Sequence, residues 1–189
     1  MQFEVKTADN EIRYFVRWNR DTEKYSKLSI VCENITPRLF INGDRIVKKE
    51  ESFNKIQEIV TRKAGFEQYE SLGKLDYGKY RVFLKDESGE HIEGCERIID
   101  LNLKILIKKD ILQTRDNNYV YLQISCEYMI PNEYWKAYVE GLESYLIDFP
   151  EMVKNTDGCY VTQCLVHRNA VSHLRLDRNI ESGLNIIVE

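Results

Sequence analysis

The chain has 189 residues, of which 43% are hydrophobic and 31% charged, and its formal net charge is −4. No stretch reaches the roughly 18 consecutive apolar residues that a membrane helix needs, which excludes a protein with membrane-spanning helices. With only nine glycines and three prolines, the chain is neither collagen-like nor a Pro/Gly-rich disordered protein. The acidic balance argues against general nucleic-acid binding, which usually needs a basic surface.

The N-terminus and the cysteines both bear on the cellular compartment. Residues 1–6 lack a basic region followed by an apolar run, so no signal peptide is expected. The number of cysteines is odd and their spacing is wide, which fits reduced thiols in the cytosol better than a disulfide framework. These cysteines are Cys32, Cys95, Cys126, Cys159 and Cys164.

Most of the first half alternates between apolar and polar residues, which predicts strands. The expected strands cover residues 3–7, 12–18, 28–33, 39–47 and 79–85. Asn42 and Gly43 interrupt the fourth of these segments. Asn-Gly accepts positive φ at both central positions of a tight turn, so these two residues predict a hairpin.

A helix is expected over residues 52–64. Apolar residues at 53, 56, 59, 60 and 64 form one stripe at helical spacing. Ser52 can cap the start, and Gly65 can take the left-handed position that ends a helix.

The second half predicts further strands around a second helix. The expected strands cover residues 99–108, 119–130, 159–167, 170–176 and 184–188. The second helix is expected from Glu133 to about Phe149, after the cap of Pro131-Asn132. Pro150 should end it, because proline disfavours helical geometry at the residue before it.

These elements predict an α+β fold with mostly antiparallel sheets of about ten strands and two main helices packed against them. Two helices are too few to serve as crossovers for a parallel sheet of that size. We expect residues 1–189 to form a single domain. If the chain forms two lobes, the turn at 113–118 is the expected boundary.

Candidate catalytic and metal-binding residues are few. Zinc would accept Cys159, Cys164, His167 and His173, but the five-residue step along a strand puts the two cysteines on opposite faces. No metal and no cofactor are therefore expected. Cys164 with His167, or Cys126 with His91, could be drawn as a nucleophile pair, although nothing in the sequence lowers a thiol pKa. Glycine-rich phosphate loops are absent.

An acidic, aromatic segment covers residues 127–157. Its charged residues are Glu127, Glu133, Glu140, Glu143, Asp148, Glu151 and Asp157, against Lys136 and Lys154. On a helical wheel Glu140 and Glu143 face water, and Tyr134 and Tyr145 lie at the border of the buried stripe. Tyr119 and Tyr121 lie on the outward face of the preceding strand.

The pattern has a plain interpretation, a solvated helix face with tyrosines at the core edge. The alternative is a docking surface, because tyrosines are enriched at binding hot spots and acids attract basic partners. The expected partner-binding residues are Tyr119, Tyr121, Tyr134, Glu140, Glu143 and Tyr145.

The sequence therefore favours a non-enzymatic, cytosolic protein-binding protein. In its most concrete form it is an inhibitor or immunity-type protein that docks a basic partner, for example a nuclease toxin. A small hydrolase or nucleic-acid-processing enzyme that uses His167 and His173 with nearby acids or thiols is the first alternative. A structural subunit of a larger assembly is the second.

Overall fold

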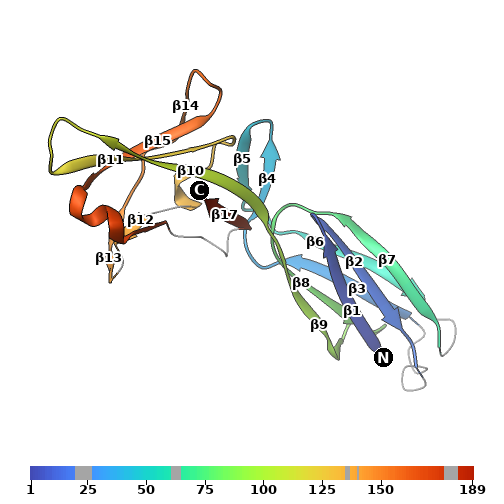
Figure 1. The fold of residues 1–189 in the computed structure, drawn as a ribbon. Coiled ribbons are helices and arrows are strands. Elements are labelled where there is room, and N and C mark those ends of the chain that lie inside the picture. Colours follow the sequence, from blue (N-terminus) through green and yellow to red (C-terminus); the bar gives the residue numbers. More distant parts are fainter. Residues whose placement is uncertain (20–26, 61–64, 135–136, 140, 177–182) are drawn as a thin grey trace. The chain divides into compact units, whose positions relative to one another are not determined.

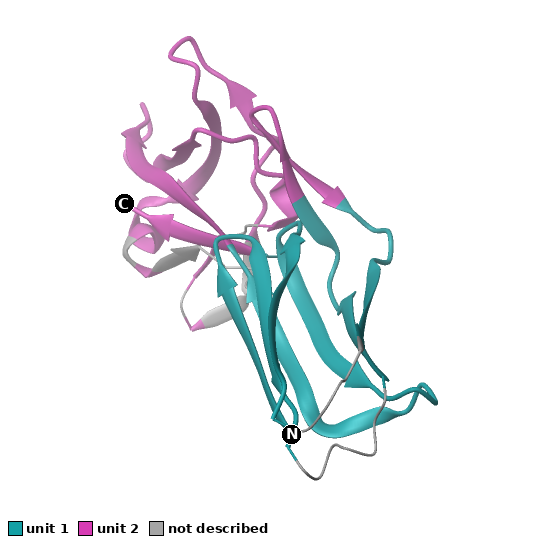
Figure 2. Ribbon diagram, turned by 90° about the vertical axis from the view of Figure 1, so that its right-hand side faces the viewer, with its two compact units in different colours: residues 1–39, 49–102, 181–183 teal, residues 40–48, 103–180, 184–189 magenta. Residues whose placement is uncertain are grey.

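A computed structural model describes residues 1–19, 27–60, 65–134, 137–139, 141–176 and 183–189. The strands are named as in Figure 1. The chain divides into two compact units, coloured separately in Figure 2. Unit 1 comprises residues 1–39, 49–102 and 181–183, and unit 2 comprises residues 40–48, 103–180 and 184–189.

Unit 1 is built from two antiparallel sheets. The first has the order β1-β2-β7, with bounds Gln2–Ala8, Glu11–Arg17 and Glu67–Lys74. The second has the order β6-β3-β8-β9, with bounds Asn54–Val60, Lys27–Asn34, Gly78–Lys85 and His91–Leu101.

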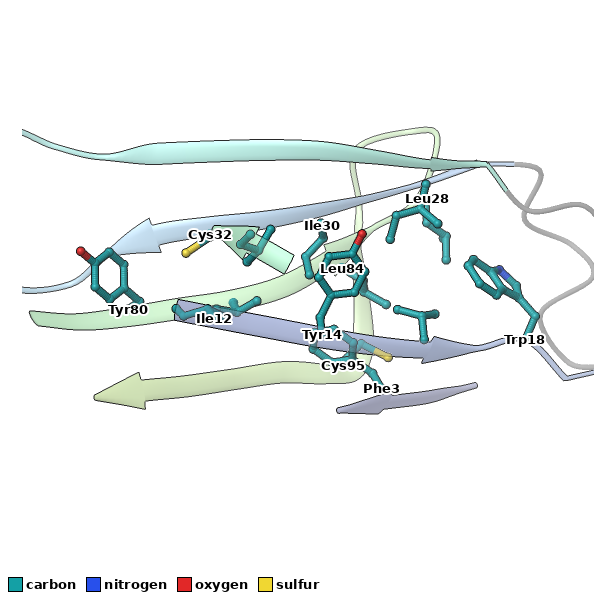
Figure 3. Packing of buried hydrophobic residues seen from close by; sticks show 14 of the residues in the cluster. Phe3, Ile12, Tyr14, Trp18, Leu28, Ile30, Cys32, Tyr80, Leu84 and Cys95 are labelled. Atoms are coloured by element: carbon teal, nitrogen blue, oxygen red, sulfur yellow. The ribbon is translucent and has the colours of Figure 1, made fainter. Parts of the chain in front are cut away.

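The core of unit 1 lies between these two sheets. Successive side chains of a strand point to opposite faces, so alternate residues of each strand meet inside the sandwich. Tyr14, Ile30 and Leu84 meet near the middle, and Trp18 and Tyr80 lie toward opposite ends (Figure 3). The buried cluster comprises Phe3, Ile12, Tyr14, Val16, Trp18, Leu28, Ile30, Cys32, Ile59, Leu72, Tyr80, Val82, Leu84, Cys95 and Leu101.

Tyr80 fastens the connection between β7 and β8. Its hydroxyl donates a hydrogen bond of 2.7 Å to the backbone carbonyl of Asp76, four residues upstream. A tyrosine at the start of a sandwich strand whose hydroxyl bonds to the backbone a few residues upstream has the geometry of the tyrosine corner of immunoglobulin-like domains. Burial raises the pKa of the Tyr80 hydroxyl, which keeps it protonated as the donor.

Unit 2 contains a five-stranded sheet in the order β14-β15-β11-β10-β17. The bounds of these strands are Val153–Lys154, Tyr160–His167, Tyr119–Cys126, Leu103–Gln113 and Leu184–Val188. All pairs are antiparallel except β10 with β17, which is parallel.

A three-stranded sheet in the order β13-β12-β16 completes the larger part of unit 2. Its strands are β13 (Leu142–Ile147), β12 (Ala137–Val139) and β16 (Leu174–Leu176). The 3-10 turns η2 (Asn132–Tyr134) and η3 (Arg168–His173) lie in the connections.

The hairpin of β4 (Arg38–Asn42) and β5 (Arg45–Lys49) interrupts the sequence of unit 1. Most of it belongs to unit 2, where the backbone N–H of Ile46 donates to the carbonyl of Met129 at 3.0 Å. The Met129 N–H donates in turn to the Asp44 carbonyl at 2.8 Å.

Unit 1 has the strand order of an immunoglobulin-like sandwich, and unit 2 resembles it except that its last strand pairs with its first. When the strands of unit 1 are lettered along the chain, with the β4–β5 hairpin as an insertion, the sheets read A-B-E and C′-C-F-G. In unit 2, β10 to β17 read A, B, C, C′, D, E, F and G. Its sheets are then D-E-B-A-G and C′-C-F, with the last strand joined to the first.

The predicted α+β class with two main helices is wrong. Within the described residues the structure is almost entirely β, and its helical segments are the short 3-10 turns η2 and η3. Residues 54–60, expected within the first helix, form β6 and pair with β3 in an unbroken antiparallel register. Ile56 and Ile59 are β-branched, and β-branched residues favour strands, a preference that the helical spacing concealed.

The second predicted helix is also wrong, because its segment forms the hairpin of β12 and β13. Gly141 lies between these strands with φ of +82°, a conformation that glycine adopts without steric cost. Ala137 then pairs with Ile147, and Tyr138 with Leu146. Gly141 therefore lies in the connection of a hairpin, within the segment that was expected to be a continuous helix from Glu133 to about Phe149.

Three smaller differences concern turns and boundaries. The β4–β5 hairpin is confirmed, but its loop is Gly43-Asp44 and only Gly43 has positive φ. Residues 168–173, partly expected as strand, form η3. The first unit gives way to the second between Asn102 and Leu103, and the turn at 113–118 lies inside unit 2. That the two units fold as a single domain stays a prediction.

Candidate functional site: an exposed tyrosine face

The outer face of the five-stranded sheet in unit 2 carries a row of apolar side chains. In the strand register Tyr121 of β11 lies between Leu112 of β10 and Leu165 of β15. Their exposed fractions are 40%, 37% and 53%. Tyr119 lies next on the same face of β11 and is 39% exposed. We call Leu112, Tyr119, Tyr121, Leu165 and His167 the tyrosine face.

The strands present these side chains outward because their alternate residues fill the core of unit 2. Val120, Leu122 and Ile124 of β11 are all about 1% exposed. A sheet with one face on a core normally carries polar residues on its other face. The apolar row is therefore not required by the packing of unit 2.

Tyr119 is held by the strand beside it. Its ring packs edge-on against the ring of His167, with centroids 5.4 Å apart. The Nδ1 atom of His167 accepts a hydrogen bond from the backbone N–H of Asn169 at 3.3 Å. This bond fixes the orientation of the ring that supports Tyr119.

Arg168 fixes the loops at the same end of the sheet. Its Nε donates to the carbonyl of Asn117 at 2.8 Å, and its Nη2 donates to Oε1 of Gln113 at 2.6 Å. Its backbone N–H donates to the carbonyl of Asn118 at 2.8 Å. These bonds order the turn that leads directly into Tyr119.

A polar, charge-balanced border adjoins the apolar row. Gln163 donates to Gln123 across β15 and β11 at 2.6 Å. Lys108 and Asp110 form an ion pair of 3.3 Å on β10. An apolar centre beside a neutral polar border is the common composition of a protein–protein interface.

The predicted partner-binding residues separate in the structure. Tyr119 and Tyr121 are brought together on the tyrosine face. Tyr134 lies in η2 and is only 5% exposed, with Nζ of Lys48 6.0 Å from its ring centroid, so it is not accessible to a partner.

The acidic members of the prediction are not part of the tyrosine face as described. Glu140 lies outside the described residues. Glu143 and Tyr145 belong to strand β13, and their side chains also lie outside the described part. Glu133, counted in the same acidic segment, pairs with Lys48 at 3.7 Å.

Sequence reasoning missed Leu112 and Leu165. Leu165 lies two residues from both Gln163 and His167, so all three point outward from the same face of β15. The alternation of that strand alone could have identified Leu165 as an outward residue. Leu112 required the pairing register of β10 with β11, because the exposed residues 111–113 show no alternation.

The cysteines are placed for packing rather than for catalysis. Cys126 and Cys164 are buried, and burial raises the pKa of each thiol to about 11. A thiol with so high a pKa is protonated at neutral pH and is a poor nucleophile. Cys164 points into unit 2 opposite Leu122, whereas His167 points outward three residues later.

Among the described residues, no three or more His, Cys, Asp and Glu side chains form a group that could hold a metal ion. No helix in this part of the chain is both long and apolar enough to cross a membrane.

No protein-family model matches the chain, and no curated protein matches it. An immunoglobulin-like architecture hosts many functions, so the fold alone does not identify one.

Proposed function

We propose that this chain is a non-enzymatic protein-binding protein that docks its partner through the tyrosine face. The observation that carries this proposal is the cross-strand row of Leu112, Tyr121 and Leu165, each more than one-third exposed. Contiguous apolar side chains on a sheet face are typical of interaction surfaces. Tyrosine is among the residues most enriched at binding hot spots.

The chemistry of the tyrosine face favours a partner surface that is apolar at its centre and polar at its edge. The Lys108–Asp110 pair cancels its own charge, so the face offers little net field to a charged ligand. A contribution from the acidic segment 127–157, which is not part of the tyrosine face as described, would add attraction to a basic partner, such as the target of an inhibitor or immunity-type protein. Attraction to a basic partner would weaken steeply with salt, whereas apolar docking would not.

The cytosol is the compartment that we propose for this activity. All five cysteines are free, and four of them are buried. Secreted domains of this size commonly use cysteines in disulfides, whereas reducing compartments keep them as thiols.

A comparative capture experiment tests the proposal. The full-length chain and a Tyr121→Glu/Leu165→Glu variant are immobilised and exposed to native-host lysate, and the retained proteins are quantified by mass spectrometry. The matched control is Ile98→Glu, which changes an equally exposed apolar residue on β9 of unit 1. All three proteins are first shown to share the same thermal midpoint.

The proposal expects a protein that the parent and the Ile98→Glu control both retain and that the double variant loses. Retention of the same proteins by the double variant would contradict it. A partner that stays bound at constant stoichiometry in high salt would favour the role of structural subunit over that of an inhibitor of a basic protein, because electrostatic attraction weakens with salt.

A further inference from the structure

The outer face of the three-stranded sheet in unit 1 holds a hollow of about 300 Å³. It lies across β1, β2 and β7, on the side of the sheet opposite the core. Phe15 lies at its centre between Glu4 of β1 and Tyr69 of β7, as the strand register places them. This volume is at the lower end of the range found for small-ligand sites.

Two aromatic rings form the apolar part of the hollow. Phe15 is half-buried, and its cross-strand partner Tyr69 is 57% exposed. A cross-strand pair of rings on one sheet face offers an apolar surface that a flat ligand can cover. The exposure of Tyr69 means that much of this surface is open to solvent.

Two arginines frame the rings from the same strand. The guanidinium carbon of Arg17 lies 5.9 Å from the centroid of Phe15. Arg13 is hydrogen-bonded to Glu11 and to Tyr69, and these two bonds raise its pKa. Planar guanidinium groups offer several N–H donors in a fixed geometry.

Every basic side chain on this face has a carboxylate beside it. Arg13 pairs with Glu11 at 2.7 Å, Arg17 with Glu67, and Lys6 with Glu4 at 4.0 Å. These pairs set three cations against three carboxylates, with Lys74 near Glu11 as a further cation outside the lining, so the hollow carries little net charge. An anionic ligand such as a phosphate or a nucleic acid would therefore gain little attraction and would have to displace a carboxylate.

A neutral sugar satisfies all of these features. A pyranose ring has an apolar C–H face that can lie on Phe15 and Tyr69. Its hydroxyls can accept from guanidinium N–H groups and donate to carboxylates such as Glu4. We propose that the outer face of β1, β2 and β7 binds a neutral hexose oligosaccharide. This site is independent of the tyrosine face in unit 2.

Titration with defined oligosaccharides tests the site. The probes are hexasaccharides of β-1,4-glucose, α-1,4-glucose, β-1,4-mannose and β-1,4-N-acetylglucosamine, with a heparin hexasaccharide as the anionic comparator. Binding to the full-length chain is measured by calorimetry and by NMR shifts of backbone amides. We expect a neutral probe to bind with a Kd of about 1 mM or tighter and to shift amides of β1, β2 and β7.

Variants assign the binding to the hollow. Tyr69→Ala removes an exposed ring without opening the core and should weaken binding about tenfold or more. Tyr119→Ala, in unit 2, should leave it unchanged. The proposal is overturned if no neutral probe binds, if the heparin fragment binds more tightly, or if Tyr69→Ala binds like the parent.

Discussion

Cys32 lies on β3 inside unit 1, fully removed from solvent, and burial raises the pKa of its thiol to about 12. Cys126 and Cys164 in unit 2 are shifted in the same direction, to about 11. The folded chain thus favours the neutral thiol at three places. Cys32 and Cys126 stand in apolar strands, where cysteine packs as a small core residue.

These thiols make the stability of the protein sensitive to alkali. An unfolded thiol ionises near its ordinary pKa of 9.0, whereas the folded thiols stay neutral to higher pH. Their contribution is fully present below pH 9 and is lost as the pH rises toward 11 to 12. The free energy of unfolding should fall by about 1 kcal/mol per thiol for each pH unit in that window.

Urea unfolding in the presence of reductant, at pH 8 and at pH 10, measures this effect. Cys32→Val should show a smaller loss between the two pH values than the parent. An equal fall in the free energy of unfolding in both proteins would mean that the Cys32 thiol does not contribute to the pH dependence.

Gly43 is the residue on which the β4–β5 hairpin turns. Its φ is +64°, and a Cβ built there would meet no heavy atom within 4 Å. The cost of a substitution is therefore backbone strain alone. Gly43→Val should lower the free energy of unfolding by about 1 kcal/mol or more, because a β-branched residue resists positive φ.

Gly43→Asn is the control, since asparagine tolerates positive φ and should cost clearly less. Urea unfolding of the two variants against the parent gives the comparison. Equal stabilities for Gly43→Val and the parent would show that this φ carries no strain.

At the scale of elements, both predicted helices fall in the same part of the architecture. Residues 54–60 form the C′ strand of unit 1, and residues 137–139 and 142–147 form the C and C′ strands of unit 2. Each segment has apolar residues whose spacing fits a helix. These segments form strands because each can pair its backbone with a neighbouring strand. The partner of β6 is β3, and β12 pairs with β13 across the Gly141 turn and with β16.

The β4–β5 hairpin is fastened at both ends by one carboxylate. Asp76 contacts Nη1 of Arg38, the first residue of β4, at 2.9 Å. It also contacts Nζ of Lys49, the last residue of β5, at 3.0 Å. Arg38 is only 8% exposed, and its guanidinium lies 4.9 Å from the ring of Phe53.

Asp76→Ala should therefore destabilise the protein by about 3 kcal/mol, because it leaves the buried Arg38 charge without its carboxylate. Asp100→Ala is the control, since the Asp100–Lys79 pair is long, at 3.9 Å, and exposed. That change should cost less than about 1 kcal/mol. Similar unfolding midpoints for the two variants in urea would contradict the role of Asp76.

For the whole molecule, the alternation of apolar and polar residues predicted many antiparallel strands. It did not predict which strands pair with one another. Alternation indicates which residues of a strand share a face, and it predicted that Tyr119 and Tyr121 point outward. It does not indicate that Leu112 and Leu165 lie on either side of Tyr121, because that depends on long-range register. The tyrosine face is a property of three paired strands.

The same limit explains the misplaced part of the predicted site. Tyr134, Glu140, Glu143 and Tyr145 were grouped by a helical wheel, and their segment is not a helix. Tyr134 is buried instead, beside Lys48 of the β4–β5 hairpin. The β4–β5 hairpin comes from the first half of the chain. Local periodicity in residues 133–149 does not predict that this hairpin packs against Tyr134.

If the tyrosine face binds a protein, the Tyr121→Ala variant should bind that protein with lower affinity. Binding kinetics are measured against the partner isolated by comparative capture, with Ile98→Ala as the control and thermal melts to verify folding. We expect a loss of about 2 kcal/mol or more of binding free energy for Tyr121→Ala, mainly through faster dissociation, and no change for the control. A folded Tyr121→Ala variant that binds with the parent's affinity would contradict it.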